Sequence, residues 1–232
     1  MSVITVDGVW KRYGRGPMVL TGIDTALAPG SVTAVLGENG CGKSTLLRIA
    51  AGITVPTRGA VRGRPGSVSY LPERFPDQLR LSARAYLRHF ARVRRLPTRV
   101  ELLDRLGFAG DLDQPMSELS KGNAQKVGLT QTFGPVGGFL VLDEPWAGLD
   151  VAARAILSDL VREAAEAGAT VLVTDHTGAA AKLPGATVYR MTEGQLRPVE
   201  DVGLVEVVVT CTSEAADQMA KLPGVQSVRR MP

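Results

Sequence analysis

Residues 37–45 read Gly37-Glu38-Asn39-Gly40-Cys41-Gly42-Lys43-Ser44-Thr45 and fit the pattern G-x-x-x-x-G-K-[S/T] at every fixed position. A short apolar run with β-branched residues, 31–36, precedes the stretch, and good helix formers follow it at 46–51. The glycines let the backbone wrap closely around an anion, and the start of a helix adds partial positive charge. The order of strand, turn and helix therefore predicts a phosphate-binding loop, and every residue of the stretch is a candidate nucleotide-binding residue.

Two side chains of the loop have separate predicted roles. Lys43 is expected to reach the β- and γ-phosphates of a nucleotide, and Ser44 to place its hydroxyl on Mg²⁺. The alternative is a glycine-rich turn before an ordinary helix. The complete spacing and both flanks disfavour that alternative.

Length and composition bound the class of protein. With 232 residues, 44% of them hydrophobic, the chain fits one α/β domain of two lobes. No apolar run approaches the roughly 20 residues of a membrane span, and early charged residues break up any signal-peptide core, so we expect a cytosolic protein. Cys41 and Cys211 have neither disulfide nor metal-ligand spacing. The mild net charge of +4 disfavours direct binding of nucleic acid.

The segment before the loop alternates short β-rich runs with turns. Runs at 3–6 and 31–36 are separated by glycines and prolines, which predicts an antiparallel β edge leading into a central strand. Tyr13 lies in this edge. Its ring could stack on an adenine base or pack in the core, and the residues alone leave both open.

A helical lobe is predicted at about residues 74–135. It follows a strand at 67–71, and apolar residues recur at helical spacing from Leu79, with Ser82 as N-cap. A second helix is expected at 99–106. Ser120 caps a third, which is predicted to run to about residue 133 and offers a second anion site at its start.

Two further strands are predicted to deliver polar residues to one edge of the sheet. The apolar run 139–142 ends in Asp143 and Glu144, and the run 169–174 is followed by an aspartate and His176. The carboxyl edge of a parallel sheet is where α/β proteins place their sites. These residues are therefore candidates for the chemistry at the phosphate loop.

Taken in order, these segments resemble the nucleotide-binding subunit of an ABC transporter. The matches are Walker A at 37–45, the signature at 119–125, Walker B with its following glutamate at 140–144, the D-loop at 148–150 and the switch histidine at His176. They span about residues 1–197. The resemblance implies a P-loop NTPase fold of the ABC ATPase type, with an antiparallel β edge, a central mostly parallel sheet and a helical lobe.

The resemblance also implies a role for each matching residue. Two subunits would face head to tail, so that each ATP lies between the Walker A loop of one and the signature of the other. Besides the loop, the nucleotide-binding residues would be Tyr13, Ser120, Gly122, Gln125 and Asp150. Asp143 and Ser44 would hold Mg²⁺. Glu144 would act on water, and His176 and Lys43 would contact the γ-phosphate.

Two motifs depart from the family's usual form. The signature reads Leu-Ser-Lys-Gly-Asn, with Lys121 and Asn123, and the Q-loop glutamine is replaced by Glu73, which we assign to catalysis and to the metal site. Both variants resemble the branch that serves ABC-2 type export permeases. We therefore expect an ATPase that pairs with a second copy and drives export through separate permeases at the inner face of the cell membrane.

Seven arginines (80, 84, 88, 92, 94, 95 and 99) and no acidic residue lie between positions 79 and 99. One interpretation is a solvated face neutralised by acids elsewhere in the fold. The other is a surface for an anionic partner, either acidic loops of the permease or anionic lipid headgroups.

Two other classes of ABC ATPase fit this sequence less well. A soluble ABC ATPase acting on nucleic acid or ribosomes usually carries tandem domains or long insertions, and this sequence shows neither. A regulatory subunit without hydrolysis is disfavoured by the intact Lys43, Asp143, Glu144 and His176. Residues 203–232 are predicted to form a small β-α-β appendage beyond an ATPase domain at 1–200.

Overall fold

The computed structural model describes residues 2–75, 78–133 and 138–199. The chain divides into two compact units, residues 1–199 and 200–232. The β-α-β appendage predicted for 203–232 lies outside the described residues, as does Cys211. The first unit holds all of the predicted site residues.

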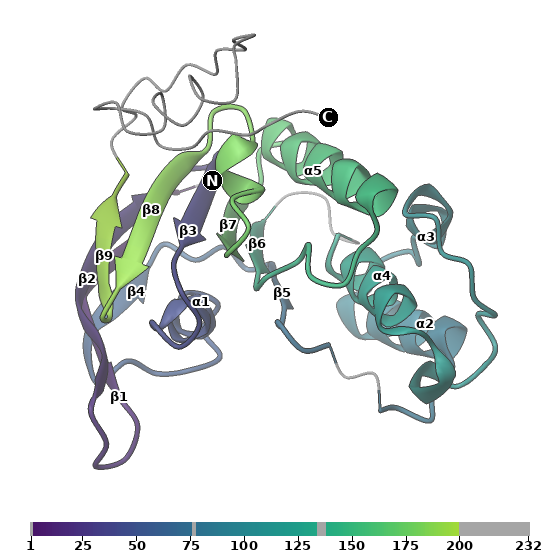
Figure 1. The fold of residues 1–232 in the computed structure, drawn as a ribbon, viewed down its shortest axis with the longest axis horizontal. Helices are drawn as coiled ribbons and strands as arrows, with labels where there is room; N and C mark the ends of the chain where they lie inside the picture. The colour runs from purple at the N-terminus through teal and green to yellow at the C-terminus, as the bar shows by residue number, and fades with distance from the viewer. Residues whose placement is uncertain (1, 76–77, 134–137, 200–232) are drawn as a thin grey trace, which may run out of the picture. The chain divides into compact units, whose positions relative to one another are not determined.

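A three-stranded antiparallel sheet in the order β2-β1-β4 forms one part of this unit (Figure 1). Its strands are β1 (Ile4–Arg12), β2 (Met18–Leu27) and β4 (Arg58–Arg62). Residues 13–17 join β1 to β2, so Tyr13 lies in a hairpin connection. The antiparallel edge expected from the sequence is confirmed.

A six-stranded sheet in the order β5-β6-β7-β3-β8-β9 forms the centre. Its strands are β3 (Val32–Leu36), β5 (Val68–Leu71), β6 (Phe139–Leu142), β7 (Thr170–Asp175), β8 (Thr187–Thr192) and β9 (Gln195–Pro198). Neighbouring strands are parallel except β8 and β9. Every residue of β6 and β7 is buried, which is typical of parallel strands covered on both faces.

Alternate residues of the central strands face two different cores. In β6, Phe139 and Val141 pack in a core shared with α1 (Lys43–Ala50) and the antiparallel sheet. Leu140 and Leu142 pack in the other core, with α5 (Val151–Glu166) and the helical lobe. This period of two places apolar layers on both faces of the sheet. Helix α1, which follows the phosphate loop, therefore packs in a different core from that of the helical lobe.

The helical lobe contains α2 (Ala83–Arg94), α3 (Glu101–Arg105), the 3₁₀ turn η1 (Met116–Glu118) and α4 (Lys121–Thr132), which gather to one side of the sheets in Figure 1. Both predicted N-caps form. The Ser82 hydroxyl accepts a hydrogen bond from the backbone N of Ala85 at 3.3 Å, and the Ser120 hydroxyl accepts one from Asn123 at 3.2 Å. None of the described helices combines the length and apolar character needed to cross a bilayer.

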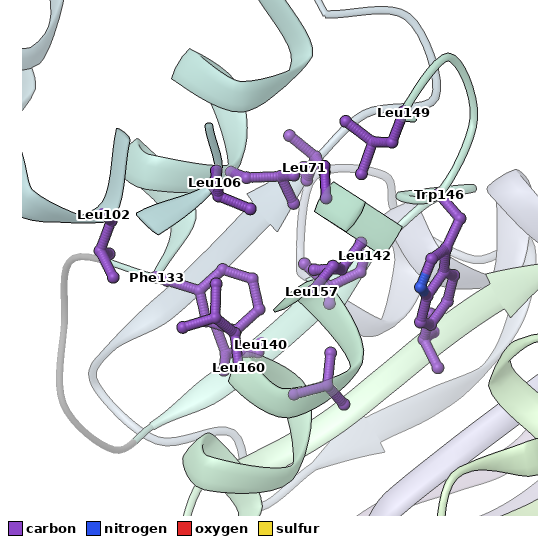
Figure 2. Close-up of a cluster of buried hydrophobic side chains, with 14 of the residues drawn as sticks. Leu71, Leu102, Leu106, Phe133, Leu140, Leu142, Trp146, Leu149, Leu157 and Leu160 are labelled. Atoms are coloured by element: carbon purple, nitrogen blue, oxygen red, sulfur yellow. The ribbon is translucent and has the colours of Figure 1, made fainter. Parts of the chain in front are cut away.

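One core joins the lobe to the central sheet. Figure 2 shows Leu140 and Leu142 of β6 beside leucines of α5, with Leu102, Leu106 and Phe133 contributed by the lobe. Leu157 of α5 is fully buried in this core. Because its side chain is enclosed by other residues of the core, truncating it to a methyl group leaves a cavity.

We expect Leu157→Ala to lower the free energy of unfolding by about 2–5 kcal/mol, because it removes buried methyl groups and leaves a void. Val55→Ala serves as the control, because Val55 is 78% exposed. It should change stability by less than about 0.5 kcal/mol. Urea unfolding followed by circular dichroism measures both. Equal effects of the two substitutions would contradict the packing described for α5.

Candidate functional site

Three neighbouring parallel strands end at the same edge of the central sheet. β6, β7 and β3 are adjacent in that order. β3 leads into the phosphate loop, β6 into Asp143 and Glu144, and β7 into His176. Because the strands share one direction, these segments meet at the carboxyl edge. The structure therefore brings the predicted phosphate loop, acids and histidine together.

The glycines of the phosphate loop are required by its backbone. Gly42 has a φ of 112°, and a Cβ there would lie 2.9 Å from the carbonyl oxygen of Val19. At Gly37 a Cβ would lie 2.5 Å from the carbonyl oxygen of Met191. Gly40 has a φ of 82°, and a Cβ there would meet nothing within 4 Å. The loop is thus tightly packed on its inner side and open at its tip, which fits a phosphate cradle.

The other loop residues differ in exposure. Glu38 and Asn39 are exposed, Cys41 is half-buried and free, and Thr45 is buried in the first turn of α1. Backbone amides at a loop tip bind phosphate whatever their side chains. The contacts predicted for these residues with a nucleotide therefore concern their backbone and stay predictions.

Lys43 is the first residue of α1 and is only 6% exposed. Its Nζ donates to the carbonyl oxygens of Gly37 at 2.6 Å and Glu38 at 3.1 Å. The same atom lies 3.3 Å from Glu144 Oε1. A buried ammonium needs such partners, because an isolated charge is costly to desolvate. All of these partners lie at the mouth of the phosphate loop.

Asp143 is fully buried at the centre of a hydrogen-bond network. Its Oδ1 accepts from Ser44 Oγ at 3.1 Å and from Thr174 Oγ1 at 2.8 Å, and its Oδ2 accepts from Tyr70 at 3.4 Å. Burial raises the pKa of Asp143, although the bonds from Thr174 and Ser44 oppose that shift. A carboxylate beside a hydroxyl gives the oxygen ligands that Mg²⁺ prefers. Ser44 and Asp143 therefore fit the predicted Mg²⁺ site.

Glu73 is exposed beyond the end of β5. Burial is the main cause of the raised pKa of Asp143, and the charge of Glu73 adds to it. Within the described part of the chain, Glu73 makes no hydrogen bond or ion pair with Asp143. Its assignment to catalysis and to the metal site stays a prediction.

Glu144 is buried and has a positive φ of 50°. Its backbone N donates to Thr174 Oγ1 at 2.9 Å. Its Oε2 lies 2.6 Å from His176 Nδ1 and accepts from the His176 backbone N at 3.3 Å. Its Oε1 faces Lys43 but accepts no hydrogen bond. A buried carboxylate oxygen without a hydrogen bond can take a further donor, such as water.

Asp175 anchors the loop that carries His176. Its Oδ1 accepts from the backbone N and the hydroxyl of Thr177, both at 2.8 Å, and its Oδ2 accepts from Ala180 N at 2.9 Å. Burial alone would raise the pKa of Asp175, but these hydrogen bonds bring it below its ordinary value. Oxygens of Glu144 and Asp175 and a ring nitrogen of His176 lie within 4.8 Å of one another. Because the Asp175 oxygens serve the loop, we interpret this group as an anchor for His176 rather than a metal site.

Helix α4, which begins within the signature at 119–125 and is called the signature helix below, contacts the loop that follows Glu144. A Cβ on Gly122 would lie 3.1 Å from the carbonyl oxygen of Gly148. Gln125 is buried, and its Nε2 donates to the carbonyl oxygen of Pro145 at 3.2 Å. Its amide therefore connects α4 to the loop after β6 within one subunit. The contact predicted between Gln125 and a nucleotide stays a prediction.

Lys126 connects α4 to the segments that carry Gly107 and Asp150. Sequence reasoning missed this residue. It is buried, and its Nζ donates to the carbonyl oxygen of Gly107 at 2.8 Å and to Asp150 Oδ2 at 3.0 Å. Asp150 also accepts from Ala153 N at 2.8 Å at the start of α5. These bonds lower the pKa of Asp150, the Ala153 bond most. The predicted nucleotide contact of Asp150 stays a prediction beside this structural role.

Ser120 and Tyr13 lie where a ligand or a partner can reach them. Ser120 is exposed at the start of α4. Tyr13 is 47% exposed, and Lys11 Nζ lies 4.8 Å from its ring centroid. The exposed ring rules out the alternative that Tyr13 is a core residue. Stacking of Tyr13 on an adenine base stays a prediction.

Sequence reasoning also missed Thr174 and Tyr70. Thr174 is the penultimate residue of a buried strand, and Tyr70 lies in β5 beside the Q-loop. A hydroxyl at the carboxyl end of an otherwise apolar strand is the signal that could have identified Thr174, because buried hydroxyls need partners.

The fold and these contacts define an α/β P-loop nucleotide-binding protein with a helical lobe. A family model described as "ABC transporter" matches residues 20–147, more than half of the chain. The chain belongs to the ABC transporter family, as an ATP-binding subunit with the ABC ATPase fold.

Several known proteins are similar to the chain. The zinc import ATP-binding protein ZnuC of Yersinia enterocolitica is 35% identical, covering 75% of this chain and 70% of ZnuC. The manganese transport system ATP-binding protein MntA of a Synechocystis species is 31% identical, covering 75% of each chain. A solved ATP binding subunit of an ABC transporter is 25% identical with a TM-score of 0.72, covering 97% of this chain and 95% of that one. The dimeric post-hydrolysis structure of the ATP-binding cassette MJ0796, bound to ADP and Pi, shares the fold at 20% identity with a TM-score of 0.73, covering 84% of this chain and 97% of that one.

We expect Thr174→Val to lower the ATP turnover rate by at least about tenfold and the unfolding free energy by about 1–3 kcal/mol. The substitution removes the hydroxyl that accepts from Glu144 N and donates to Asp143. Thr174→Ser is the control, because it keeps the hydroxyl and should retain most of the activity. Steady-state turnover and urea unfolding give the two readouts. Equal turnover in the Val and Ser variants would contradict a role for the hydroxyl.

Proposed function

We propose that this chain drives a membrane permease by hydrolysing ATP, and that Glu144 acts on the attacking water. The observation that carries the proposal is the position of the Glu144 carboxylate, which is buried between Lys43 and His176. Phosphoryl transfer needs mainly placement and charge stabilisation. This site supplies a cation, a candidate base and oxygen ligands around one point.

The phosphate loop and Lys43 bind the nucleotide. Backbone amides of the loop and the N-terminus of α1 supply partial positive charge for the phosphate oxygens. The exposed ring of Tyr13 offers a face for the adenine base. Mg²⁺, when held by Ser44 and Asp143, supplies charge neutralisation at the phosphates. These roles follow from donor type and position in the loop.

Nucleotide binding changes the partners of Lys43. In the structure the ammonium contacts Glu144 and two loop carbonyls. A phosphate bears more negative charge than one carboxylate, so it competes for the ammonium. Once Lys43 turns to phosphate, Glu144 Oε1 is free to accept a hydrogen bond from water. Binding therefore prepares the base for its task.

His176 holds the other side of the same carboxylate. Because a carboxylate oxygen accepts, the 2.6 Å contact places a donor on His176 Nδ1 and leaves Nε2 for another partner. We assign the γ-phosphate as that partner; its oxygens accept, so Nε2 donates to them when both ring nitrogens carry a proton. The loop anchored by Asp175 keeps the ring in place, so His176 orients Glu144 and contacts the nucleotide at the same time.

A second copy of the chain completes the site. Ser120 is exposed at the start of α4, and in the described chain it makes no contact with Lys43, Glu144 or His176. A helix start of this kind binds anions. We propose that Ser120 and Gly122 of one copy close on the ATP of the other in a homodimer.

The transport partner is proposed to be an integral membrane permease, with this subunit at the cytoplasmic face. The relatives named above serve import of zinc and transport of manganese, which does not support the export direction expected from the signature and Glu73. The substrate path belongs to the permease. The direction of transport can be measured in inside-out vesicles that contain the whole transporter, with ATP added to the external medium. Export would carry the substrate into the vesicle lumen, and import would carry it out.

We expect Glu144→Gln to lower ATP turnover by at least about 100-fold, because the amide cannot take a proton from water. Binding of ATP should persist, and a nucleotide-dependent dimer should accumulate. Lys43→Ala should weaken binding itself, because the loop loses its ammonium. A phosphate-release assay, equilibrium binding and gel filtration with ATP measure the three effects.

Glu166→Gln is the matched control. Glu166 is exposed on α5, and its ion pair among the described residues is with Arg162 of the same helix. The same chemical change there should leave turnover within twofold of wild type. If Glu144→Gln hydrolysed ATP at the wild-type rate, a residue other than Glu144 would have to activate the attacking water.

A further inference from the structure

A stripe of exposed basic side chains lies on α2, in the helical lobe (Figure 1). We define the basic face as Arg84, Arg88 and Arg92 of α2 with Arg95, the C-cap residue; all four side chains are exposed. At 3.6 residues per turn, the three helical arginines fall within an arc of about 80° and span about 12 Å of the helix. They therefore form one continuous stripe.

The opposite side of α2 attaches the helix to the protein. Tyr86 and Leu87 are buried there, and Phe90 packs against the same core. The rings of Tyr86 and Phe90 have centroids 4.6 Å apart. The aromatic residues of α2 are thus used in packing, and the basic face is fixed as an outward surface of a folded helix.

Most of the charge on the basic face is not neutralised. Arg84 forms an ion pair with Asp113, with nitrogen to oxygen distances of 2.8 and 3.2 Å. Arg84 lowers the pKa of Asp113 most, and Arg88 contributes through its charge. In the described ranges, Arg88, Arg92 and Arg95 form no ion pair. Among the described residues, three exposed guanidinium groups therefore form no ion pair.

Helix stability does not account for this arrangement. Cations near the C-terminus of a helix are favourable, which accounts for Arg92 and for Arg95 at the C-cap but not for Arg84 and Arg88. Arg84 lies in the first turn, where a cation opposes the helix dipole, and α2 has no acidic residue in that turn. Arginines four residues apart also repel each other. The stripe of arginines therefore lowers the stability of α2 itself. A face that only contacts solvent does not require arginines to be clustered in this way.

We propose that the basic face of α2 binds the headgroups of anionic phospholipids. Charge complementarity supports this partner, because a bilayer surface offers a plane of phosphates to a stripe of guanidinium groups. Membership of a transporter family brings the chain close to a membrane. Single-stranded nucleic acid is the less suitable anion, because it stacks its bases on exposed aromatic rings, whereas Tyr86 of α2 is buried and Phe90 packs against the core.

The mode of binding follows from which side of α2 is buried. Because the apolar side of the helix is used in the protein core, α2 cannot insert into the acyl region as an amphipathic surface helix does. Binding is electrostatic, reversible and weakened by salt. This surface is separate from the ATP site, so lipid binding and basal ATP hydrolysis can be lost independently.

The experiment measures binding of the full chain to protein-free vesicles by co-sedimentation, across a salt series. One set of vesicles is phosphatidylcholine, and the other is an equal mixture with phosphatidylglycerol. We expect binding only to the anionic set. Arg88→Gln, Arg92→Gln and Arg95→Gln together should lower the partition coefficient by at least about tenfold, with a shallower salt dependence and unchanged basal ATPase activity.

The matched control is Arg58→Gln, Arg190→Gln and Arg197→Gln, which removes the same charge from exposed residues on β4, β8 and β9. It should lower binding less than twofold. Equal loss in both triple variants would overturn the proposal, because net charge alone would explain it. Failure of the wild-type chain to bind anionic vesicles would also overturn it and leave the permease or a nucleic acid as partner.

Discussion

The nucleotide site depends on one buried ion pair, between Lys43 of the phosphate loop and Glu144 after β6. Each group is at most 8% exposed at its side chain, so each would be strongly destabilising without the other. Removing one partner of a buried pair typically costs about 3–5 kcal/mol. A ligand that takes Lys43 must therefore compensate Glu144 or leave it free to bind water. In the proposed mechanism, nucleotide binding and the activation of Glu144 as a base are therefore a single event.

The sheet places this pair, and hydroxyl groups hold it. Thr174 of β7 bonds both Glu144 N and the Asp143 carboxylate, so the base and the predicted metal ligand share one anchor. The signature helix is tied to the same region, because Gln125 holds Pro145 and Lys126 holds Asp150. In the proposed dimer, a movement of that helix caused by a partner's nucleotide would be transmitted to the loop after Glu144.

Local chemistry made much of this site predictable. The phosphate loop, the Ser82 and Ser120 caps and the strand ends carrying Asp143 and Glu144 each depend on residues close in sequence. Thr174 and Lys126 were missed because their partners lie far along the chain, and the position of a hydroxyl or an ammonium group in its own element does not identify the residue that it bonds. The exposure of Tyr13 and the internal use of Gln125 likewise follow from tertiary packing.

The ion pair can be tested most directly by a double-mutant cycle in the nucleotide-free protein. Lys43→Met, Glu144→Gln and the double variant are compared with wild type by urea unfolding. The account predicts that each single substitution destabilises the protein, and that the double variant is more stable than the sum of the two effects by about 1 kcal/mol or more. Additive effects, within about 0.3 kcal/mol, would contradict the claim that this pair holds the site together.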